Sequence, residues 1–501
     1  MREVITYIST MRELKFGVLL VFLSAFCSCS EDGGSDDTLS TQDKTKAKER
    51  TLKNIERRDT LRAMTTYSAT SYFLYRGEPM GYEYELMKRF ADYLDVELEI
   101  VVSNNIDSMF YYLNNGTVDL IAHGLTITQA RKKEVAFSDY LYLVNQVLVQ
   151  RKPENWRSMS WSSIQSHLIS DPIELIGDTV SIRQNTSYLG RLHNLSEEIG
   201  GEILVDTLPG KFSTDEIIQL VVKGEIEYTI ADNNLAAINA SYYPILDIEV
   251  PISFSQRVGW AVSKNSDELL NAMNDWISGM KKESDYYVIY NKYFKNKRDF
   301  RRRVKSEFFS INNNRISEYD PLIQKYAEEI GWDWRLLASL VYQESRFKPE
   351  ATSWADAAGL MQIMPATAQD LGVKDRSDPE QSLKGGTKYL EQLYGNFEKV
   401  PDSLDRIKFT MASFNAGLGH LQDARRLAEK RDLDPNVWND NVAEMLLSLS
   451  YPKSFNDPVV RYGYVRGIEP YTYVSQIMER YGHYVQFIEK DQQISLALSV
   501  E

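Results

Sequence analysis

The chain has 501 residues, of which 43% are hydrophobic and 12% aromatic, and this is enough for the cores of about two to four globular domains. Its formal net charge of -14 at pH 7 argues against general nucleic-acid binding, because most of the surface would repel a polyanion. Composition therefore excludes a disordered chain and a non-specific nucleic-acid binder.

The first 29 residues have the pattern of an export signal. Arg12 and Lys15 precede an apolar run over residues 16–26, which is too short for a confident membrane span. A second methionine, Met11, begins a better-proportioned signal than Met1, so the sequence leaves both starts open.

Both cysteines of the chain follow this run, so the mature protein is expected to contain no disulfide. The stretch resembles a bacterial lipobox, in which a small residue precedes the lipid-modified cysteine, and Ser28-Cys29 fits that pattern better than Phe26-Cys27. We therefore expect lipidation at Cys29 and attachment to the outer membrane on its periplasmic face. A secreted protein without a lipid is the alternative. Residues 30–57 are polar, as in a flexible tether.

From residue 58 short apolar strands alternate with helices, as in LRAMTTY (61–67) and EYELMKRFADYLDVELEIVV (83–102). This alternation predicts α/β layers around a largely parallel sheet. A strand over 119–123 is expected to lead into a polar loop over 124–128 and then to Arg131.

Hydroxyls and an arginine just beyond the carboxyl end of a strand can bind a carboxylate. By spacing alone Arg131 fits equally well as a surface residue beside Lys132 and Lys133. Residues 114–142 resemble the signature of periplasmic solute-binding proteins for polar amino acids. That resemblance extends over residues 58–297 and implies two lobes that close over a ligand, with the second lobe at about 151–248.

The resemblance also implies the ligand contacts. Arg131 and Thr126 would hold a ligand carboxylate, Asp232 would hold the ligand amine, and Thr186 and Ser187 would supply hydroxyls from the second lobe. The implied ligand is an amino acid or a muropeptide.

The sequence departs from this family at three positions. His123 and Gly124 stand where small hydroxyl residues are usual, and Asn185 replaces a usual glycine, so the side chain of the ligand cannot be derived. The five histidines are scattered without ligand spacing, and we expect no metal and no cofactor.

A basic run, KNKRDFRRRVK (295–305), follows the α/β part. We interpret it as part of a solvated linker over 298–316 rather than as a nucleic-acid-binding patch. After it, Asp320-Pro321 begins a helix that Gly331 ends.

Further helices are expected in the segments 382–397, 406–417 and 437–449. We therefore predict an all-α domain over 317–490, followed by a tail over 491–501.

One helix of this domain carries a glutamate on its apolar face. Asp333 is a suitable N-cap, and the apolar spacing of Leu336, Leu337, Leu340 and Val341 continues to Glu344. An ionised carboxylate there must be paired, neutralised by a raised pKa or open to a cleft. The helix alone leaves pairing of Glu344 with Arg335 or Arg346 equally open.

Four motifs decide between these interpretations. Glu344-Ser345, GLMQIMPATA (359–368), SFNAG (413–417) and EPYTYV (469–474) together resemble the lytic transglycosylase domain, a lysozyme-like helical fold that cleaves the glycan of peptidoglycan. The fold class is thus multidomain: a two-lobed α/β binding domain followed by an all-α lysozyme-like domain.

The resemblance assigns roles by position. Glu344 would be the catalytic acid and base, Ser353 would support the N-acetyl group of the substrate, and Tyr473 would form a hydrogen bond near the acid. The residues implied in substrate binding are Gln362, Met364 and Asn415.

The chemistry fits a single acid. A glycosidic bond breaks when an acid protonates the leaving oxygen, so the acid must remain neutral near pH 7. Contact of Glu344 with Leu340, Val341, Met361 and Met364 would raise its pKa by desolvation. The family's mechanism uses one glutamate and closes a 1,6-anhydro ring on N-acetylmuramic acid.

Some features leave alternatives open. The methionines of GLMQIMP are equally typical of ordinary core, and Phe414 and Pro470 stand where the family usually has Tyr and Thr. We expect a peptidoglycan lytic transglycosylase regulated by ligand binding to its N-terminal domain. The alternatives are a non-catalytic lipoprotein that binds an amino acid and holds glycan, and a muramidase that uses water.

Overall fold

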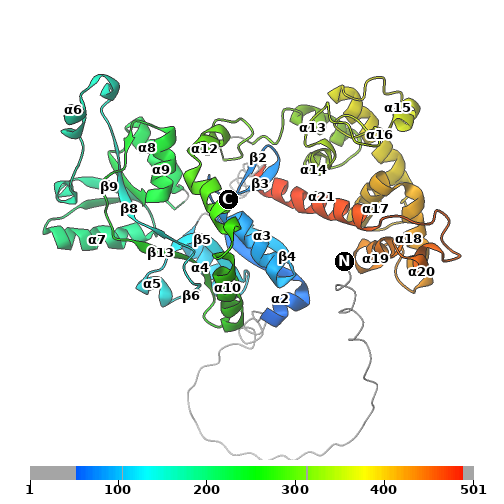
Figure 1. The fold of residues 1–501 in the computed structure, drawn as a ribbon, viewed down its shortest axis with the longest axis horizontal. Coiled ribbons are helices and arrows are strands. Elements are labelled where there is room, and N and C mark those ends of the chain that lie inside the picture. The colour runs from blue at the N-terminus through cyan, green and yellow to red at the C-terminus, as the bar shows by residue number, and fades with distance from the viewer. Residues whose placement is uncertain (1–51, 104, 211, 312–313, 489–501) are drawn as a thin grey trace, which may run out of the picture. The chain divides into compact units, whose positions relative to one another are not determined.

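A computed structural model describes residues 52–103, 105–210, 212–311 and 314–488 (Figure 1). No helix within these ranges is long and apolar enough to cross a membrane. The signal peptide, the lipidation site Cys29, most of the tether and the tail over 491–501 lie outside the described residues.

The first lobe is built on a mixed sheet with the strand order β4-β1-β5-β13-β6, with β7 also paired to β13. β1 lies parallel to β4 and β5, whereas β13 lies antiparallel to β5. The strands are β1 (Thr60–Thr65), β4 (Glu97–Val102), β5 (Leu120–Thr126), β6 (Ala136–Phe137), β7 (Tyr142–Val144) and β13 (Gln256–Val262). The helices of this lobe are α2 (Leu52–Arg58), α3 (Tyr82–Leu94), α4 (Ile106–Asn115), α5 (Gln129–Lys132), α10 (Asp267–Met280), α11 (Ser284–Tyr290) and η3 (Asn291–Lys295).

The second lobe has its own sheet, with the order β10-β9-β11-β8-β12. Its strands are β8 (Gln146–Arg151), β9 (Thr179–Arg183), β10 (Leu204–Leu208), β11 (Tyr228–Asp232) and β12 (Leu246–Asp247). Its helices are η1 (Trp156–Ser158), α6 (Trp161–Gln165), η2 (Pro172–Leu175), α7 (Ser187–Ile199), α8 (Thr214–Lys223) and α9 (Asn233–Tyr242). Because β8 belongs to this sheet, the second lobe begins before residue 151. In each sheet the first three strands of the order are parallel and the strands that follow pair antiparallel, so both sheets are mixed rather than largely parallel.

The chain crosses between the lobes twice, after β7 and before β13. The two crossing segments are bonded to each other, since Gln146 N donates to Ser253 Oγ at 2.9 Å and Ser255 Oγ donates to Asn145 Oδ1 at 3.0 Å. The paired crossings form a hinge of the kind that closes two-lobed proteins over a ligand.

One local expectation was wrong. The polar loop expected from Gly124 begins later, because β5 continues to Thr126, where it pairs with Val258 of β13. Pairing with a neighbouring strand outweighs the low strand propensity of glycine at this position.

The basic segment after the first lobe is also more ordered than a solvated linker. Residues Lys297–Val304 form helix α12, in which Phe300 and Arg303 are buried. The Arg303 guanidinium lies 5.8 Å from the ring centroid of Phe73 and 5.5 Å from that of Tyr293. Stacking on these rings therefore holds part of the basic run against the first lobe.

The C-terminal part is all helical except for isolated bridges that join Ala358 to Thr352 and Ile363. Its helices are α13 (Asp320–Glu329), α14 (Trp334–Ser345), α15 (Pro365–Leu371), α16 (Pro379–Gly395), α17 (Ser403–Ala416), α18 (Leu418–Lys430), η4 (Trp438–Val442), α19 (Ala443–Ser448), α20 (Pro452–Phe455) and α21 (Ile468–Phe487). The helix expected over 437–449 is interrupted, because Asn439 and Asp440 have non-helical backbone angles.

Helix α21 packs along α14 and α17 and ends beside the hairpin of β2 (Phe73–Tyr75) and β3 (Glu78–Met80) (Figure 1). Arg76 and Gly77, with φ of 53° and 78°, form the turn of this hairpin. Tyr484 Oη of α21 donates to Gly77 O at 2.7 Å, and a Cβ at Gly77 would lie 2.7 Å from that hydroxyl. A glycine is needed here both for the turn and for the close approach of α21.

Gly359 has a similar constraint inside the GLMQIMP segment. Its φ is 86°, and a Cβ would lie 1.8 Å from Arg376 O. We predict that Gly359→Ala destabilises the protein by roughly 2 kcal/mol more than Gly372→Ala, because overpacking adds to the shared strain of a left-handed residue.

Gly372 is a matched control, since its φ is 75° and nothing lies within 4 Å of its Cβ position. Urea unfolding measures the free energy of unfolding of both variants. An equal loss of stability in the two would show that the close approach of Gly359 to Arg376 is unimportant.

Candidate functional site

Helix α14 presents Glu344 at its last turn. Asp333 caps the helix by accepting a hydrogen bond from Arg335 N, and Tyr481 Oη of α21 donates to Asp333 Oδ2 at 2.9 Å. The face over Leu336–Val341 is buried, as the apolar spacing predicts. The helix ends at Arg346 and Phe347, whose φ values are 52° and 59°. Capping and packing therefore fix the position of Glu344 relative to α21.

Glu344 is half-buried and has one hydrogen-bond partner among the described residues. Tyr473 Oη of α21 donates to Glu344 Oε1, and Tyr473 itself is buried. No ion pair joins Glu344 to Arg335 or Arg346 in the part of the chain that the structure describes, and Arg335 instead pairs with Asp333 at 2.7 Å. Burial raises the pKa of Glu344 to about 7, and the hydrogen bond from Tyr473 opposes part of that rise.

The loop after α14 is tied to the end of the helix. Ser345 Oγ donates to Leu360 O at 3.0 Å, so the GLMQIMP segment starts beside the acid. Gln362 Nε2 donates to Ala351 O at 2.9 Å and to Gly359 O at 3.0 Å. The amide group of Gln362 thus holds the loop together, in addition to the substrate-binding role that the sequence implies.

The other expected residues lie at different depths. Ser353 Oγ accepts hydrogen bonds from Ala355 N at 3.3 Å and from Ala357 N at 3.0 Å, which fixes its hydroxyl. Met364 is 44% exposed at the start of α15, whereas Met361 is fully buried, so the core interpretation holds for Met361 only. Asn415 is exposed near the end of α17.

In the described part of the chain, no second carboxylate forms a hydrogen bond with Glu344 or shifts its pKa. Glu350 and Asp356 are exposed, and Asp356 pairs with Arg376 at 3.4 Å. Among the described residues, neither forms a hydrogen bond with Glu344 or Tyr473. The helical domain thus offers one neutral acid near pH 7, which suits protonation of a leaving oxygen.

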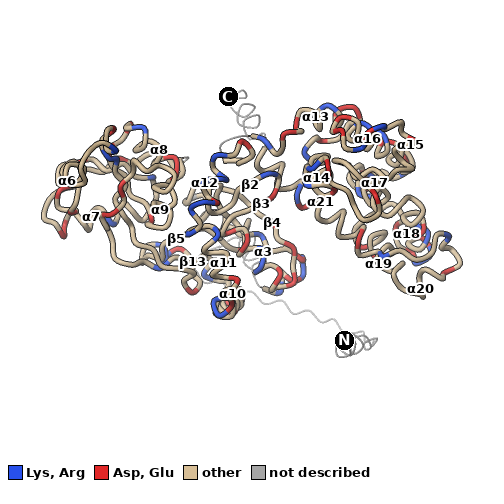
Figure 2. The backbone as a smooth tube through the Cα atoms, turned by 45° about the horizontal axis from the view of Figure 1, so that its top comes forward, with Lys and Arg blue, Asp and Glu red and all other residues tan. Residues whose placement is uncertain are grey.

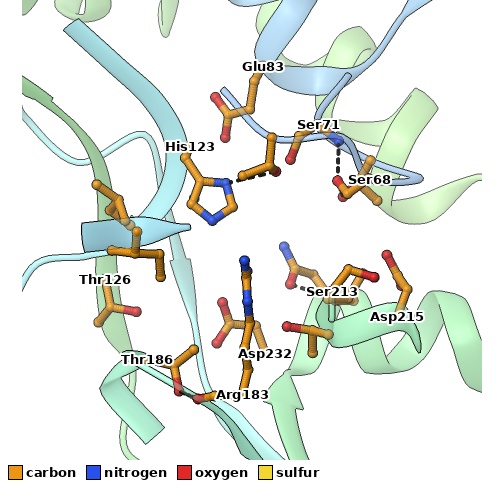
Figure 3. Close-up of a pocket in the computed structure, with 18 of the residues that line it drawn as sticks. Ser68, Ser71, Glu83, His123, Thr126, Arg183, Thr186, Ser213, Asp215 and Asp232 are labelled. Carbon is orange, nitrogen blue, oxygen red and sulfur yellow. Dashed lines mark hydrogen bonds between the residues drawn. The ribbon is translucent and has the colours of Figure 1, made fainter. Parts of the chain in front are cut away.

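A separate cavity of about 110 Å³ lies between the two lobes (Figure 3). It is lined by all five residues that the sequence implies in ligand binding, namely Thr126, Arg131, Thr186, Ser187 and Asp232. Thr126 ends β5, Asp232 ends β11, and Thr186 and Ser187 begin α7. Strand ends and a helix start from both lobes therefore meet at one site.

Hydrogen bonds fix these side chains. Arg131 Nη1 donates to Thr126 O at 3.0 Å, which directs the guanidinium along the end of β5. Ser187 Oγ of the second lobe donates to Thr126 Oγ1 of the first at 3.4 Å. Tyr188 Oη lies 3.5 Å from Asp232 Oδ1. Burial raises the pKa of Asp232 to about 7, so a ligand cation would favour its ionised form.

The sequence analysis missed several other residues of the cavity wall. Glu83, Arg183 and Asp215 line it, as does His123, which the sequence marked only as a departure from the family pattern. Burial, together with the nearby charges of Arg183 and Arg131, lowers the pKa of His123 to about 3, so this imidazole is neutral. Arg183 ends β9, and an arginine at the carboxyl end of a strand is a signal that could have indicated this residue.

The described residues contain no group of three or more His, Cys, Asp or Glu side chains placed to hold a metal ion.

We predict that the stability of the protein responds to the protonation of Glu344. The pKa of this carboxyl is about 7 in the folded state against an ordinary value of 4.5, so the folded protein binds the proton more tightly. Its stabilising contribution is complete below the ordinary pKa and is lost as the pH rises through about 7. The stability of Glu344→Gln relative to wild type should therefore be roughly 3 kcal/mol higher at pH 8 than at pH 4.

Urea unfolding at the two pH values measures this gain. Glu350→Gln, which changes an exposed carboxylate of the neighbouring loop, is the control. If the difference in free energy of unfolding between Glu344→Gln and wild type is the same at both pH values, the pKa of Glu344 is not raised.

Two families match the two halves of the chain. Residues 61–296 match the family of bacterial extracellular solute-binding proteins, family 3, and residues 321–437 match the transglycosylase SLT domain. One similar solved structure is an ancestral amino acid-binding protein, a precursor of cyclohexadienyl dehydratase, at 27% identity, with a TM-score of 0.39 over 49% of this chain and 99% of that chain.

Relatives that match both halves carry one name, membrane-bound lytic murein transglycosylase F. The protein of Desulfosudis oleivorans is 35% identical over 83% of this chain and 88% of its own length. That of Shewanella pealeana is 34% identical over 83% of both chains, and that of Vibrio cholerae is 33% identical over 88% and 82%. The chain therefore belongs to the family of membrane-bound lytic murein transglycosylases F and is a lytic transglycosylase that acts on peptidoglycan.

Proposed function

We propose that Glu344 cleaves the bond between N-acetylmuramic acid and N-acetylglucosamine and that the product is a 1,6-anhydro sugar. The observation that carries this proposal is the single acid, half-buried, bonded to Tyr473 and, within the described residues, without a hydrogen bond to a second carboxylate. Most glycosidases use two carboxylates, either as nucleophile and acid or as base and acid. With a single acid, the substrate itself can supply the nucleophile, and the 6-hydroxyl of the muramic acid is such a group.

The reaction begins when protonated Glu344 donates its proton to the glycosidic oxygen. The bond from that oxygen to C1 of the muramic acid breaks, and positive charge develops on the sugar. The resulting Glu344 carboxylate then accepts the proton of the sugar's own 6-hydroxyl while that oxygen bonds to C1. Glu344 is protonated again at the end, and no water is consumed.

Tyr473 is a positioning residue for this cycle. Its hydroxyl donates to Glu344 Oε1 and stabilises the carboxylate form, so the acid does not become too weak to donate its proton. Ser353 is proposed to support the N-acetyl group, and its hydroxyl is held by backbone N–H groups on the same loop. Gln362, Met364 and Asn415 are proposed to contact the glycan.

We predict that the protein releases 1,6-anhydro-muramic acid products from purified peptidoglycan and that Glu344→Gln abolishes release by at least about a thousandfold. Mass spectrometry separates these products from hydrated reducing ends by the mass of one water. Hydrated ends would mean hydrolysis by water, and equal activity of Glu344→Gln would remove Glu344 from the mechanism.

The second part of the proposal is a ligand in the cavity between the lobes. Arg131 and Thr126 would bind a carboxylate, Asp232 would bind an amine, and Thr186 and Ser187 would complete the head-group site. All five line one cavity, and a guanidinium facing a carboxylate suits a zwitterion. An amino acid or the peptide of a muropeptide supplies such a head group.

We further propose that this ligand regulates the enzyme. Tyr67 lines the ligand cavity and donates through its hydroxyl to Gln486 O of α21 at 2.6 Å. The same helix carries Tyr473, which holds Glu344. One rigid element thus has a contact near each site, which supports coupling between ligand binding and the position of Tyr473.

We predict that a ligand from a panel of free amino acids and a synthetic stem tetrapeptide increases the rate of glycan cleavage about fivefold or more, within the usual range of coupling. Tyr67→Phe should retain ligand affinity within about twofold yet lose most of the activation, because it keeps the ring and removes the hydroxyl that bonds to Gln486 O. Calorimetry and the rate of soluble product release measure the two quantities.

Arg131→Ala is the control that should lose both binding and activation. Full activation in Tyr67→Phe would contradict coupling through this contact.

The relatives are named as membrane-bound proteins, and we propose that this chain also acts at the cell envelope, attached through a lipid on Cys29 to the outer membrane. A lipid anchor with the tether over 30–57 would keep the enzyme close to its insoluble substrate.

A further inference from the structure

A second groove, of about 510 Å³, lies where the helical domain meets the first lobe. Its wall on the helical side comes from α14 and α21, and its wall on the lobe side comes from α3, β3 and the η3 segment. Gln343 and Gln476, which line it, are bonded to each other at 2.9 Å. Gln343 directly precedes Glu344 in α14, so the groove begins next to the catalytic acid.

The groove is richer in cations than the rest of the protein. Five cationic side chains line it, namely Lys88, Arg89, Lys292, Arg346 and Arg480. Three carboxylates line it as well, so two positive charges remain in excess, whereas the whole chain has a net charge of -14. Apart from the basic helix α12, acidic and basic residues are interspersed along most of the described chain (Figure 2).

Two of the three carboxylates of the groove have partners on its wall. Glu479 pairs with Lys88 at 2.7 Å, and Glu85 pairs with Lys292 at 2.6 Å and with Arg89 at 3.6 Å. The remaining carboxylate, Glu78, is exposed at the start of β3. Burial lowers the pKa of His483, which also lines the groove, so this imidazole adds no positive charge near neutral pH.

The two arginines of the helical side differ. Arg480 lies 4.4 Å from the ring centroid of Tyr342 and donates to Gln343 Oε1 at 3.1 Å, so its guanidinium is held in place. Arg346 is exposed, and its side chain forms no hydrogen bond or ion pair within the described ranges. Its backbone is fixed, because it caps α14 in the left-handed conformation. Arg346 therefore presents a positive charge two residues beyond the catalytic acid, and within the described residues it pairs with no carboxylate, although Glu78 lines the same groove.

We propose that this groove binds the carboxylates of the peptides that the glycan strand carries. Peptidoglycan bears short peptides on its muramic acid units, and their free carboxylates are the anionic groups nearest to the bond that Glu344 would cleave. A peptide leaving the glycan at the active site has to pass along one wall of the helical domain, and this groove starts at Gln343. Arg346 and Arg480 bind the peptide from the helical side, and Arg89 adds charge from the first lobe.

The proposal gives the first lobe a direct part in substrate binding, separate from the ligand cavity between the lobes. It rests on the peptidoglycan-cleaving activity of the family, and the regulation by a small ligand is not needed for it.

The test compares two substrates of one glycan. Intact peptidoglycan carries the peptides, and the same material treated with an amidase carries none. We expect Arg346→Glu to raise KM on intact peptidoglycan by roughly five- to tenfold, in the range of one or two exposed ion pairs, and to leave KM on stripped glycan within about twofold. Added salt should reduce the difference, because screening weakens exposed charge pairs.

Two further variants complete the experiment. Arg89→Gln, on the lobe side, should raise KM on intact peptidoglycan by about twofold to threefold, since it removes one charge that Glu85 already offsets in part. Lys453→Glu changes the charge by the same amount as Arg346→Glu at an exposed position of α20 and should change neither KM.

The outcomes separate the possible failures. An equal rise of KM on both substrates would place Arg346 on the glycan and overturn the proposal, as would no change on either. Loss of cleavage of both substrates by the wild type would instead mean that the catalytic function itself is wrong.

Discussion

The proposed chemistry depends on one carboxylic acid that is kept out of an ion pair. Glu344 ends an amphipathic helix on its buried side, and within the described residues its partner is a tyrosine hydroxyl rather than a cation. A neighbouring arginine would hold the carboxylate ionised and remove its proton-donating ability at neutral pH. The structure avoids this by pairing Arg335 with the N-cap Asp333 and by ending the helix so that Arg346 lines a different groove.

Helix α21 is the element through which this arrangement reaches the rest of the chain. It supplies Tyr473 to the acid, Tyr481 to the cap of α14, Tyr484 to the hairpin of the first lobe and the Gln486 carbonyl to Tyr67. The buried residues of the first lobe and of the helical domain form one continuous hydrophobic cluster. A change in the first lobe that moves the end of α21 thus acts on a helix that also positions the acid.

Much of this could be predicted from the sequence, because the strongest signals are local. The N-cap at Asp333 and the apolar spacing up to Glu344 describe α14 correctly, and the polar residues at strand ends converge on one cavity as expected. The prediction was weaker where tertiary contacts determine the length of a strand or the formation of a helix. Pairing with β13 extends β5 to Thr126, and stacking on Phe73 and Tyr293 orders the basic segment as α12.

Tertiary contacts also explain why some residues of the site could not be predicted. Glu83 is the second residue of α3 and has the position of an ordinary first-turn acid, yet the fold places it 2% exposed on the wall of the cavity, where it accepts a hydrogen bond from Trp260 Nε1 at 2.6 Å. Trp260 is 177 positions away along the chain, so the spacing of residues in the sequence could not predict this contact. The groove between α14, α21 and the first lobe is likewise formed by segments that only the fold brings together.

The central claim is that Glu344 remains protonated near neutral pH because of its surroundings. Carbon-13 NMR of glutamate side-chain carboxyls, with Glu344→Gln used to assign the signal, measures its titration directly. The account predicts a midpoint near pH 7, as burial raises the pKa to about that value. A midpoint at the ordinary value of a glutamate, near 4.5, would mean that the carboxyl is solvated or paired and that it cannot serve as the acid.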